Sequence, residues 1–229
     1  MKIGIIGAMK CETDTLKNLL KNARSETVSG IEYCTGTLCG KEVVIATCGI
    51  GKVFAAICAQ TMILRYKPDV IINSGVAGTL SDKLSVCDIA ISNDLVQHDM
   101  DTSAIGDPVG LISGINIINI PADKKLCEII KSTADSLGMR AICGTIASGD
   151  VFVAEKEKKD HIKSIFSAIA CEMEGASIGQ VCYVNSVPFA VIRAISDGGD
   201  ESAALSYDKF VKIAAENSVK LLCKVLENL

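Results

Sequence analysis

The segment Lys2-Ile-Gly-Ile-Ile-Gly-Ala-Met9 decides the fold class, because it is a short apolar run followed at once by a helical period over residues 11–23. The run predicts a buried strand, and the same alternation recurs along the whole chain. Further strands are expected at residues 70–73, 88–92, 141–147, 168–173 and 189–196, and helices at 53–66, 124–137, 176–184 and 207–226. We therefore predict one α/β domain over residues 1–229, a three-layer α/β/α structure with a mixed, mainly parallel sheet.

Two segments depart from this alternation. Residues 32–38 and 42–47 are typical of a hairpin that turns at Cys39-Gly40-Lys41. Residues 97–123 are rich in Gly and Pro and have no clear period. A long irregular loop inside a compact domain is usually functional.

Composition excludes several classes of protein. The 229 residues are 49% hydrophobic but only 4% aromatic, so the core must be aliphatic. The net charge of −4 offers no electrostatic reason to bind nucleic acid or anionic membrane. The apolar N-terminal run is too short for a signal peptide, and the uncharged stretch 175–192 carries Gln180, Asn185 and Pro188, which disfavour a membrane span.

Cysteine usage indicates a protein of a reducing compartment, and histidine usage disfavours a metal site in it. The eleven cysteines are an odd number, evenly spread, and none forms a CxxC pair. With only two histidines, a zinc site is disfavoured. We expect reduced thiols, a cytoplasmic location, and neither metal nor cofactor.

Two glycine motifs fall short of nucleotide-binding signatures. Gly4-Ile-Ile-Gly7 lacks the GxGxxG spacing, and Gly49-Ile-Gly-Lys52 lacks the GxxxxGK[ST] spacing of a P-loop. Tight turns are the favoured interpretation of both, with the second still able to line a pocket.

Acidic side chains stand where apolar runs end. Glu12, Glu174 and Asp197 follow or close predicted strands, and ligands bind at strand ends in α/β sheets. Either Glu174 or Asp197 alone could be a helix cap. All three together favour acid–base chemistry. Glu172 is either a second acid at the same site or a surface residue.

Arg193 lies inside the apolar run 188–196. A buried guanidinium is costly unless it is paired with an acid, so Glu12 or Glu174 is the expected partner. The alternative is an edge strand from which Arg193 points into solvent.

His98-Asp99 could be a catalytic dyad or metal ligands, and Phe152 could stack on a flat ligand or fill the core.

The motifs together resemble a known family. Gly7-Ala-Met-Lys-Cys-Glu12, Cys48-Gly-Ile-Gly-Lys52, the segment 68–78, Ser148-Gly-Asp150, Glu172-Met-Glu174 and Arg193-Ala-Ile-Ser-Asp197 occur in that order. The chain is similar over nearly its whole length to bacterial 5'-methylthioadenosine/S-adenosylhomocysteine nucleosidases, within the nucleoside phosphorylase superfamily. The resemblance implies hydrolysis of an N-glycosidic bond with release of adenine.

The resemblance also implies roles for individual residues. Asp197, assisted by Ser196, would protonate adenine N7. Glu12, held by Arg193, would deprotonate the attacking water. Glu174 would accept the ribose hydroxyls, with Met173 against the sugar. Phe152 would stack on adenine, and Val153 would offer it backbone groups. The remaining expected substrate contacts are Met9, Ile50, Val76, Ala77, Gly78, Glu172 and Tyr207.

This chain departs from the family pattern in places. Val76 stands where a serine usually helps to hold the water, and Ile105 and Asp107 stand where aromatics commonly wall the 5' pocket. The loop holding Ile105 often borders a partner subunit in this family, so a homodimer is expected.

Other functions compete with the nucleosidase. A phosphorylase on the same fold would need arginines for phosphate, yet Arg24, Arg65 and Arg140 are predicted to lie away from the site. A weakly active purine-binding module is a third alternative. The favoured 5' substituent, and the use of a related substrate such as 6-amino-6-deoxyfutalosine, stay open.

Overall fold

The computed structural model describes residues 1–229 apart from the side chain of Leu205. The strands are β1 (Lys2–Gly7), β2 (Lys21–Val28), β3 (Ile31–Leu38), β4 (Lys41–Thr47), β5 (Val70–Thr79), β6 (Ile89–Gln97), β7 (Ile120–Pro121), β8 (Ala141–Ser148), β9 (Ala170–Glu172) and β10 (Phe189–Asp197). The helices are α1 (Lys10–Asn18), α2 (Lys52–Tyr66), the short 3-10 helix η1 (Ser103–Ile105), α3 (Lys124–Ser136), α4 (Lys156–Phe166), α5 (Gly175–Val184) and α6 (Ala203–Asn228).

One mixed sheet forms the centre of the molecule. Its order is β10-β6-β8-β9-β5-β1-β4-β3-β2, and β10 also pairs with β5, so five of its strands close into a ring. Strands β4, β1, β5 and β10 run parallel to one another, whereas β6 meets β10, and β9 meets β5, in antiparallel pairs. The closure brings strand ends that are distant in sequence to one edge of the sheet.

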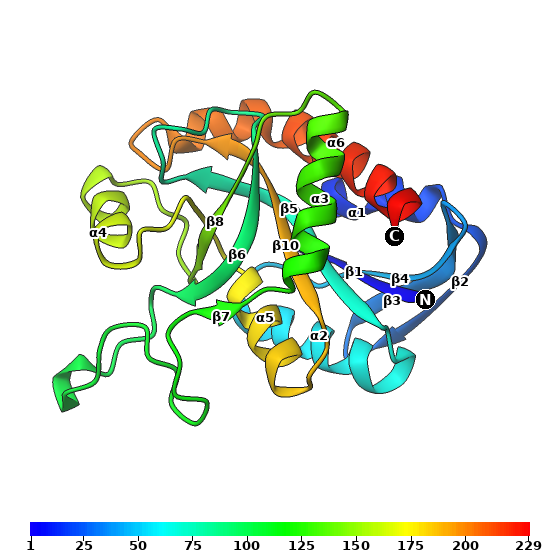
Figure 1. Ribbon diagram of the computed structural model, residues 1–229, viewed down its shortest axis with the longest axis horizontal. Coiled ribbons are helices and arrows are strands. Elements are labelled where there is room, and N and C mark those ends of the chain that lie inside the picture. The colour runs from blue at the N-terminus through cyan, green and yellow to red at the C-terminus, as the bar shows by residue number, and fades with distance from the viewer.

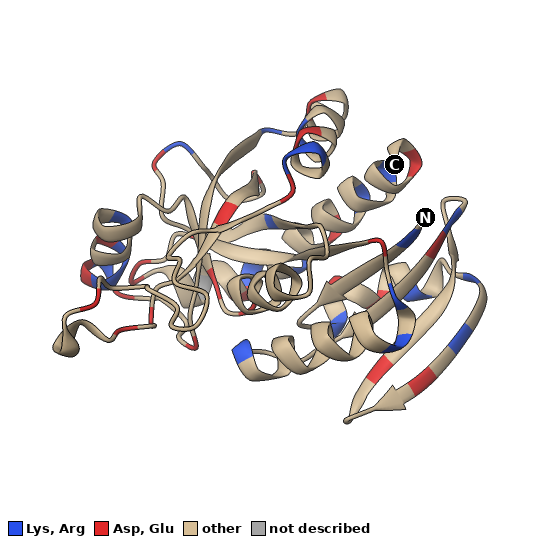
Figure 2. Ribbon diagram, turned by 60° about the horizontal axis from the view of Figure 1, so that its bottom comes forward, with Lys and Arg blue, Asp and Glu red and all other residues tan. Residues whose placement is uncertain are grey.

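Helices cover both faces of the sheet, as predicted (Figure 1). One aliphatic core packs α2 and α5 against the sheet, and a second packs α1, α3 and α6 against the other face. A smaller cluster holds α4 next to β8. The charged residues are scattered along the ribbon without separation by sign (Figure 2). Among the described residues, no helix has the length and apolar character to cross a membrane.

Most predicted elements are present, but several of their bounds differ and the structure adds others. The first helix ends at Asn18 rather than near residue 23, and β2 follows it. Strand β2 is polar and almost fully exposed, so it has no hydrophobic pattern, and its pairing with β3 defines it. Helix α4 was not predicted; its short sequence buries only Ile162 and Phe166. Strands β5 and β6 also extend beyond the predicted ranges, to Thr79 and Gln97.

The sheet register places the carboxyl ends of β5 and β10 side by side. Ile195 pairs with Ala77 and Asp197 with Gly78, with an irregularity between Ile195 and Asp197. Such a bulge re-aims the side chain that follows it. Asp197 therefore lies at the sheet edge beside Gly78.

Candidate functional site

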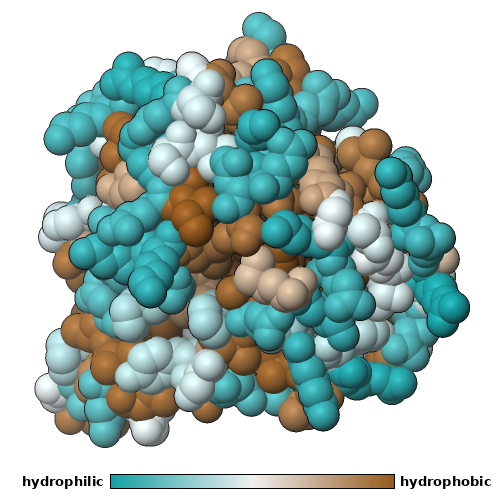
Figure 3. All heavy atoms as spheres, turned by 45° about the vertical axis from the view of Figure 1, so that its right-hand side comes forward, coloured by the Kyte–Doolittle hydropathy of each residue, from teal (hydrophilic) through white to brown (hydrophobic). Residues whose placement is uncertain are grey.

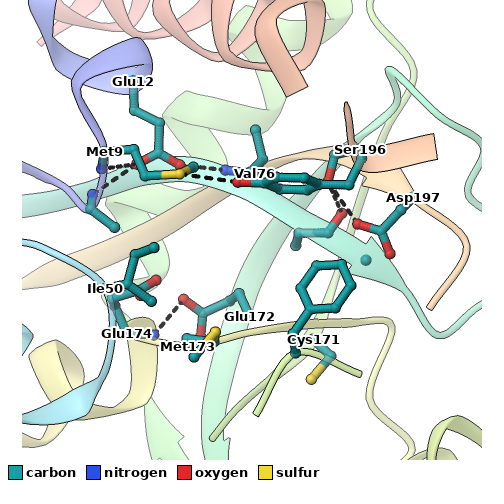
Figure 4. A pocket seen from close by; sticks show the side chains of 15 residues that line it. Met9, Glu12, Ile50, Val76, Cys171, Glu172, Met173, Glu174, Ser196 and Asp197 are labelled. Atoms are coloured by element: carbon teal, nitrogen blue, oxygen red, sulfur yellow. Dashed lines mark hydrogen bonds between the residues drawn. The ribbon is translucent and has the colours of Figure 1, made fainter. Parts of the chain in front are cut away.

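A cavity of about 400 Å³ opens at this edge of the sheet (Figure 4). The residues around it that were expected from the sequence are Met9, Glu12, Ile50, Val76, Ala77, Gly78, Phe152, Glu172, Met173, Glu174, Ser196, Asp197 and Tyr207. Val153 lines a small adjoining hollow together with Phe152 and Asp197. Ala8 and Cys171 also line the cavity; neither was predicted, because both are small residues that flank the acidic motifs.

Glu12 is held at the start of α1 by backbone amides. Its Oε2 accepts hydrogen bonds from the N–H groups of Ala8 (2.7 Å) and Met9 (2.9 Å), and its Oε1 accepts one from Val76 (3.1 Å). Burial raises the pKa of Glu12, while the charge of Arg193 and these amides lower it. A Cβ at position 75 would lie 2.5 Å from Glu12 Oε1, so Gly75 makes room for the carboxylate.

Arg193 is buried and forms an ion pair with Glu174, one of the two acids expected as its partner, but its closest acidic partner is Glu172. Its Nη2 donates to Glu172 Oε2 and, at 2.6 Å, to Asn73 Oδ1, with Glu174 Oε2 at 3.6 Å. In the part of the chain that the structure describes, Arg193 makes no hydrogen bond to Glu12. The expectation that Arg193 holds Glu12 is thus corrected: Arg193 influences Glu12 through its charge and is itself anchored by Glu172.

Glu172 is buried, not on the surface, and accepts several hydrogen bonds. Its Oε1 accepts from the Ser148 hydroxyl, and its Oε2 accepts from the N–H groups of Glu174 (3.0 Å) and Gly175 (2.7 Å). Glu172 therefore satisfies the free amides at the N-terminus of α5, where the helix dipole also favours a negative charge. Although Glu174 occupies the N-cap position, its side chain makes no capping bond.

The Glu174 side chain lines the cavity instead. Its Oε1 accepts the Gly51 N–H at 2.9 Å. Burial, followed by the nearby charge of Glu172, raises the pKa of Glu174, and Arg193 opposes that shift. Glu174 thus offers acceptor oxygens to a ligand in the cavity.

Asp197 is placed where it can hold a proton. Its Oδ2 accepts the Ser196 hydroxyl at 2.8 Å, and its Oδ1 accepts the Gly199 N–H at 2.9 Å. Burial raises the pKa of Asp197 although both hydrogen bonds lower it. Because the N-cap of α6 is Ser202, Asp197 does not cap that helix.

The remaining wall is aromatic and aliphatic. The rings of Phe152 and Tyr207 meet edge to face with centroids 5.6 Å apart, and the Tyr207 hydroxyl donates to the Met9 sulfur at 3.0 Å. Phe152 is about half exposed rather than filling the core. An apolar cavity with a few convergent polar groups suits a flat ligand with a polar edge.

His98 and Asp99 do not line this cavity. Asp99 pairs with Lys52 and not with His98. Among the described residues, no three His, Cys, Asp or Glu side chains gather as metal ligands would.

Comparison with known proteins identifies the family. The sequence profile of the phosphorylase superfamily matches residues 2–227. The chain belongs to the phosphorylase superfamily. Within this superfamily, it is 40% identical to the 5'-methylthioadenosine/S-adenosylhomocysteine nucleosidase of Shewanella halifaxensis and 39% identical to that of Bacillus subtilis, each over the full length of both chains.

Solved structures of superfamily members agree with the fold. The Neisseria meningitidis nucleosidase in complex with methylthio-immucillin-A superposes with a TM-score of 0.96 at 36% identity, covering 100% of this chain and 99% of that one. The futalosine hydrolase of Helicobacter pylori also gives 0.96, at 38% identity, covering 100% and 98%. The nucleoside phosphorylase-like fold predicted from the sequence is confirmed.

The anchoring role of Glu172 leads to a stability prediction. Glu172→Gln leaves the Arg193 charge buried without its main partner, so the free energy of unfolding in urea should fall by about 3–5 kcal/mol. The control is Asp135→Asn, which removes the exposed 2.6 Å pair with Lys131 and should cost less than about 1 kcal/mol. Equal stabilities of Glu172→Gln and wild type would show that Asn73 and Glu174 suffice for Arg193.

Proposed function

We propose that this protein hydrolyses the N-glycosidic bond of 5'-methylthioadenosine and S-adenosylhomocysteine, releasing adenine and the 5'-thio-substituted ribose. The observation that carries the proposal is an apolar cavity bordered by two carboxyl groups, Asp197 and Glu12, whose pKa values burial raises. Full-length relatives named as nucleosidases for these two compounds support the substrate class.

Asp197 acts as the general acid in this proposal. Adenine is a poor leaving group as an anion, and a proton placed on N7 lets it depart neutral. The raised pKa keeps the proton on Asp197, and the Ser196 and Gly199 hydrogen bonds stabilise the carboxylate that forms. Phe152 and Val153 beside Asp197 are suited to hold the purine ring.

Glu12 acts as the base towards water. Three backbone amides fix its carboxylate, so its remaining lone pairs can orient one water and take its proton as the oxygen bonds to C1'. Val76 contributes its amide to Glu12 and supplies no hydroxyl to the water. Glu174 would accept hydrogen bonds from the ribose hydroxyls, with Met173 lying against the sugar, as the sugar gains oxocarbenium character.

Water rather than phosphate is the favoured nucleophile. Arg24 and Arg65 are exposed, Arg65 pairs with Glu26, and Arg140 donates to the Lys83 carbonyl. The cavity is instead bordered by carboxylates that would repel phosphate. The phosphorylase alternative thus lacks a cationic site for its second substrate.

Adenine release should therefore be the same in phosphate-free and phosphate-containing buffer, with free alkylthio-ribose as the product. We would measure release from 5'-methylthioadenosine, S-adenosylhomocysteine and 6-amino-6-deoxyfutalosine, the last because the chain also resembles a futalosine hydrolase. A ribose 1-phosphate product would establish a phosphorylase. Absence of adenine from all three would refute the nucleosidase.

The role of Asp197 leads to a prediction about rate and pH. Asp197→Asn keeps the shape and removes the proton donor, so kcat should fall roughly 10²–10⁴-fold. In the wild type, kcat/KM should fall as the pH rises through the elevated pKa of Asp197, because the protonated form is the active one. The variant should lack that decline on the basic side. Retention of most of the activity would remove Asp197 from the role of acid.

The state of the cysteines bears on where in the cell the protein works. The eleven cysteines are all free, which is typical of a reducing compartment, and we propose the cytoplasm.

We further propose that the protein is a homodimer. Helices α2 and α5 lie together, joined by a 2.9 Å hydrogen bond from Asn185 to Gln60. Their outer surface, the α2–α5 apolar face, consists of Val53, Phe54, Ile57, Leu64, Tyr183 and Val184. Hydrophobic side chains also gather at the bottom of the view in Figure 3, the level at which these helices lie in Figure 1. An apolar patch of this kind marks an interaction site, and a second copy is the occupant expected from the family.

Light scattering should accordingly give a mass twice that of the 24.1 kDa chain. Leu64→Glu buries a charge in the interface and should shift the protein towards monomer. The matched control, Ile213→Glu, alters a half-exposed side chain on α6 and should leave the mass unchanged. A monomeric wild type would refute the dimer.

A further inference from the structure

Three sequence segments that the proposed chemistry leaves unexplained meet beside the cavity. Gly49-Ile-Gly-Lys52 joins β4 to α2, His98-Asp99 follows β6, and Ser148-Gly-Asp150 follows β8. They are far apart in sequence, yet side chains from each bond to the others.

Asp99 connects two of these segments through its two oxygens. Its Oδ1 accepts Lys52 Nζ at 2.6 Å, and its Oδ2 accepts the Asp150 N–H at 2.9 Å. Gln97 Oε1 accepts a second hydrogen bond from Lys52 Nζ at 3.1 Å. The Lys52 and Asp99 side chains are 20% and 25% exposed, so solvent screens this pair only in part.

Asp150 completes the connection by capping α2 from another loop. Its Oδ1 accepts the Lys52 N–H at 2.8 Å, in the first turn of the helix. The N-cap residue, Gly51, has no side chain with which to cap, and its φ of 99° favours glycine. A Cβ at Gly51 would lie 3.0 Å from Asp150 Oδ1, so the carboxylate lies close against the turn.

This cap fixes the direction of the neighbouring amide. With Lys52 N–H bound to Asp150, Gly51 N–H donates to Glu174 Oε1 at 2.9 Å. The turn that contains Gly51 also carries Ile50, and the loop that contains Asp150 also carries Phe152. The bond from Lys52 N–H to Asp150 therefore joins the two parts of the cavity wall formed by Ile50 and Phe152.

We propose that Asp150 is a positioning residue, supported by Asp99 and Lys52, which aims the Gly51 amide at Glu174 and so orients the acceptor for the ribose hydroxyls. This inference rests on the proposed function. Asp150 does not touch the substrate; it acts through Gly51 on Glu174.

The test compares variants at position 150 with adenine release from 5'-methylthioadenosine as the assay. Asp150→Ala removes the acceptor and should lower kcat/KM by about 3- to 30-fold, the range expected for loss of a helix cap. Asp150→Asn keeps Oδ1 as an acceptor and should restore most of that loss. Asp82→Ala, which removes an exposed pair with Lys163, is the control variant for a surface aspartate.

A double-mutant cycle separates positioning from general loosening. In a Glu174→Ala background, Asp150→Ala should have less than about a twofold further effect, because the acceptor of the Gly51 N–H, through which Asp150 acts, is already absent. The same fold-loss in both backgrounds would overturn the proposal. If Asp150→Ala does not fold, Asp99→Ala enters the cycle in its place, with the same two outcomes.

Binding gives a readout that does not need turnover. Calorimetry would compare two proteins, Asp197→Asn and the double variant Asp197→Asn/Asp150→Ala. The first should bind 5'-methylthioadenosine more tightly than its 2'-deoxy counterpart, and the second should show a smaller difference between the two affinities. An unchanged preference would count against the positioning role. Failure of the otherwise unmodified enzyme to release adenine would instead refute the proposed function and leave the binding comparison intact.

Discussion

The buried ion pair between Arg193 and Glu172 is the interaction on which the site depends. Arg193 is 1% exposed and donates to Glu172. The same Glu172 carboxylate also accepts hydrogen bonds from the backbone amides at the start of α5. An uncompensated guanidinium in this position would cost several kcal/mol. The pair therefore constrains the end of β9, the start of α5 and the middle of β10 together. Glu174 faces the cavity because Glu172 has taken over the capping of α5.

The closed ring of strands makes this arrangement possible. Because β10 closes the ring by pairing in parallel with β5, which is also parallel to β1, the carboxyl ends of β1, β5 and β10 lie at one edge of the sheet. The bulge before Asp197 then turns that carboxyl towards the cavity. The sheet holds Asp197 directly and Glu12 through the amide of Val76, while the turns at Gly51 and Asp150 form the facing wall. Hydrogen bonds join these turns to each other and to Glu174.

Burial of the three carboxyl groups at the cavity makes the stability of the folded protein depend on pH. Burial raises the pKa values of Glu12, Glu174 and Asp197, so each is less readily ionised in the folded protein than in the unfolded chain. Their contribution to stability is greatest at pH values below their unfolded pKa and is lost as the pH rises through the folded pKa. Aliphatic packing on both faces of the sheet offsets this cost.

The sequence by itself determined the alternation of strands and helices, the strand-end positions of Glu12, Glu174 and Asp197, and the burial of Arg193, because hydrophobic periodicity and desolvation act locally. It could not identify β2 or predict α4, since an exposed strand carries no apolar pattern and a short, charged helix carries little. It also left the partner of Arg193 and the place of Glu172 undecided. Tertiary structure decided both, because spacing along the chain cannot show which of three neighbouring acids lies against a guanidinium. The bonds between Lys52, Asp99 and Asp150 also could not be predicted from spacing, because they join residues 47 to 98 positions apart that only the tertiary structure brings together.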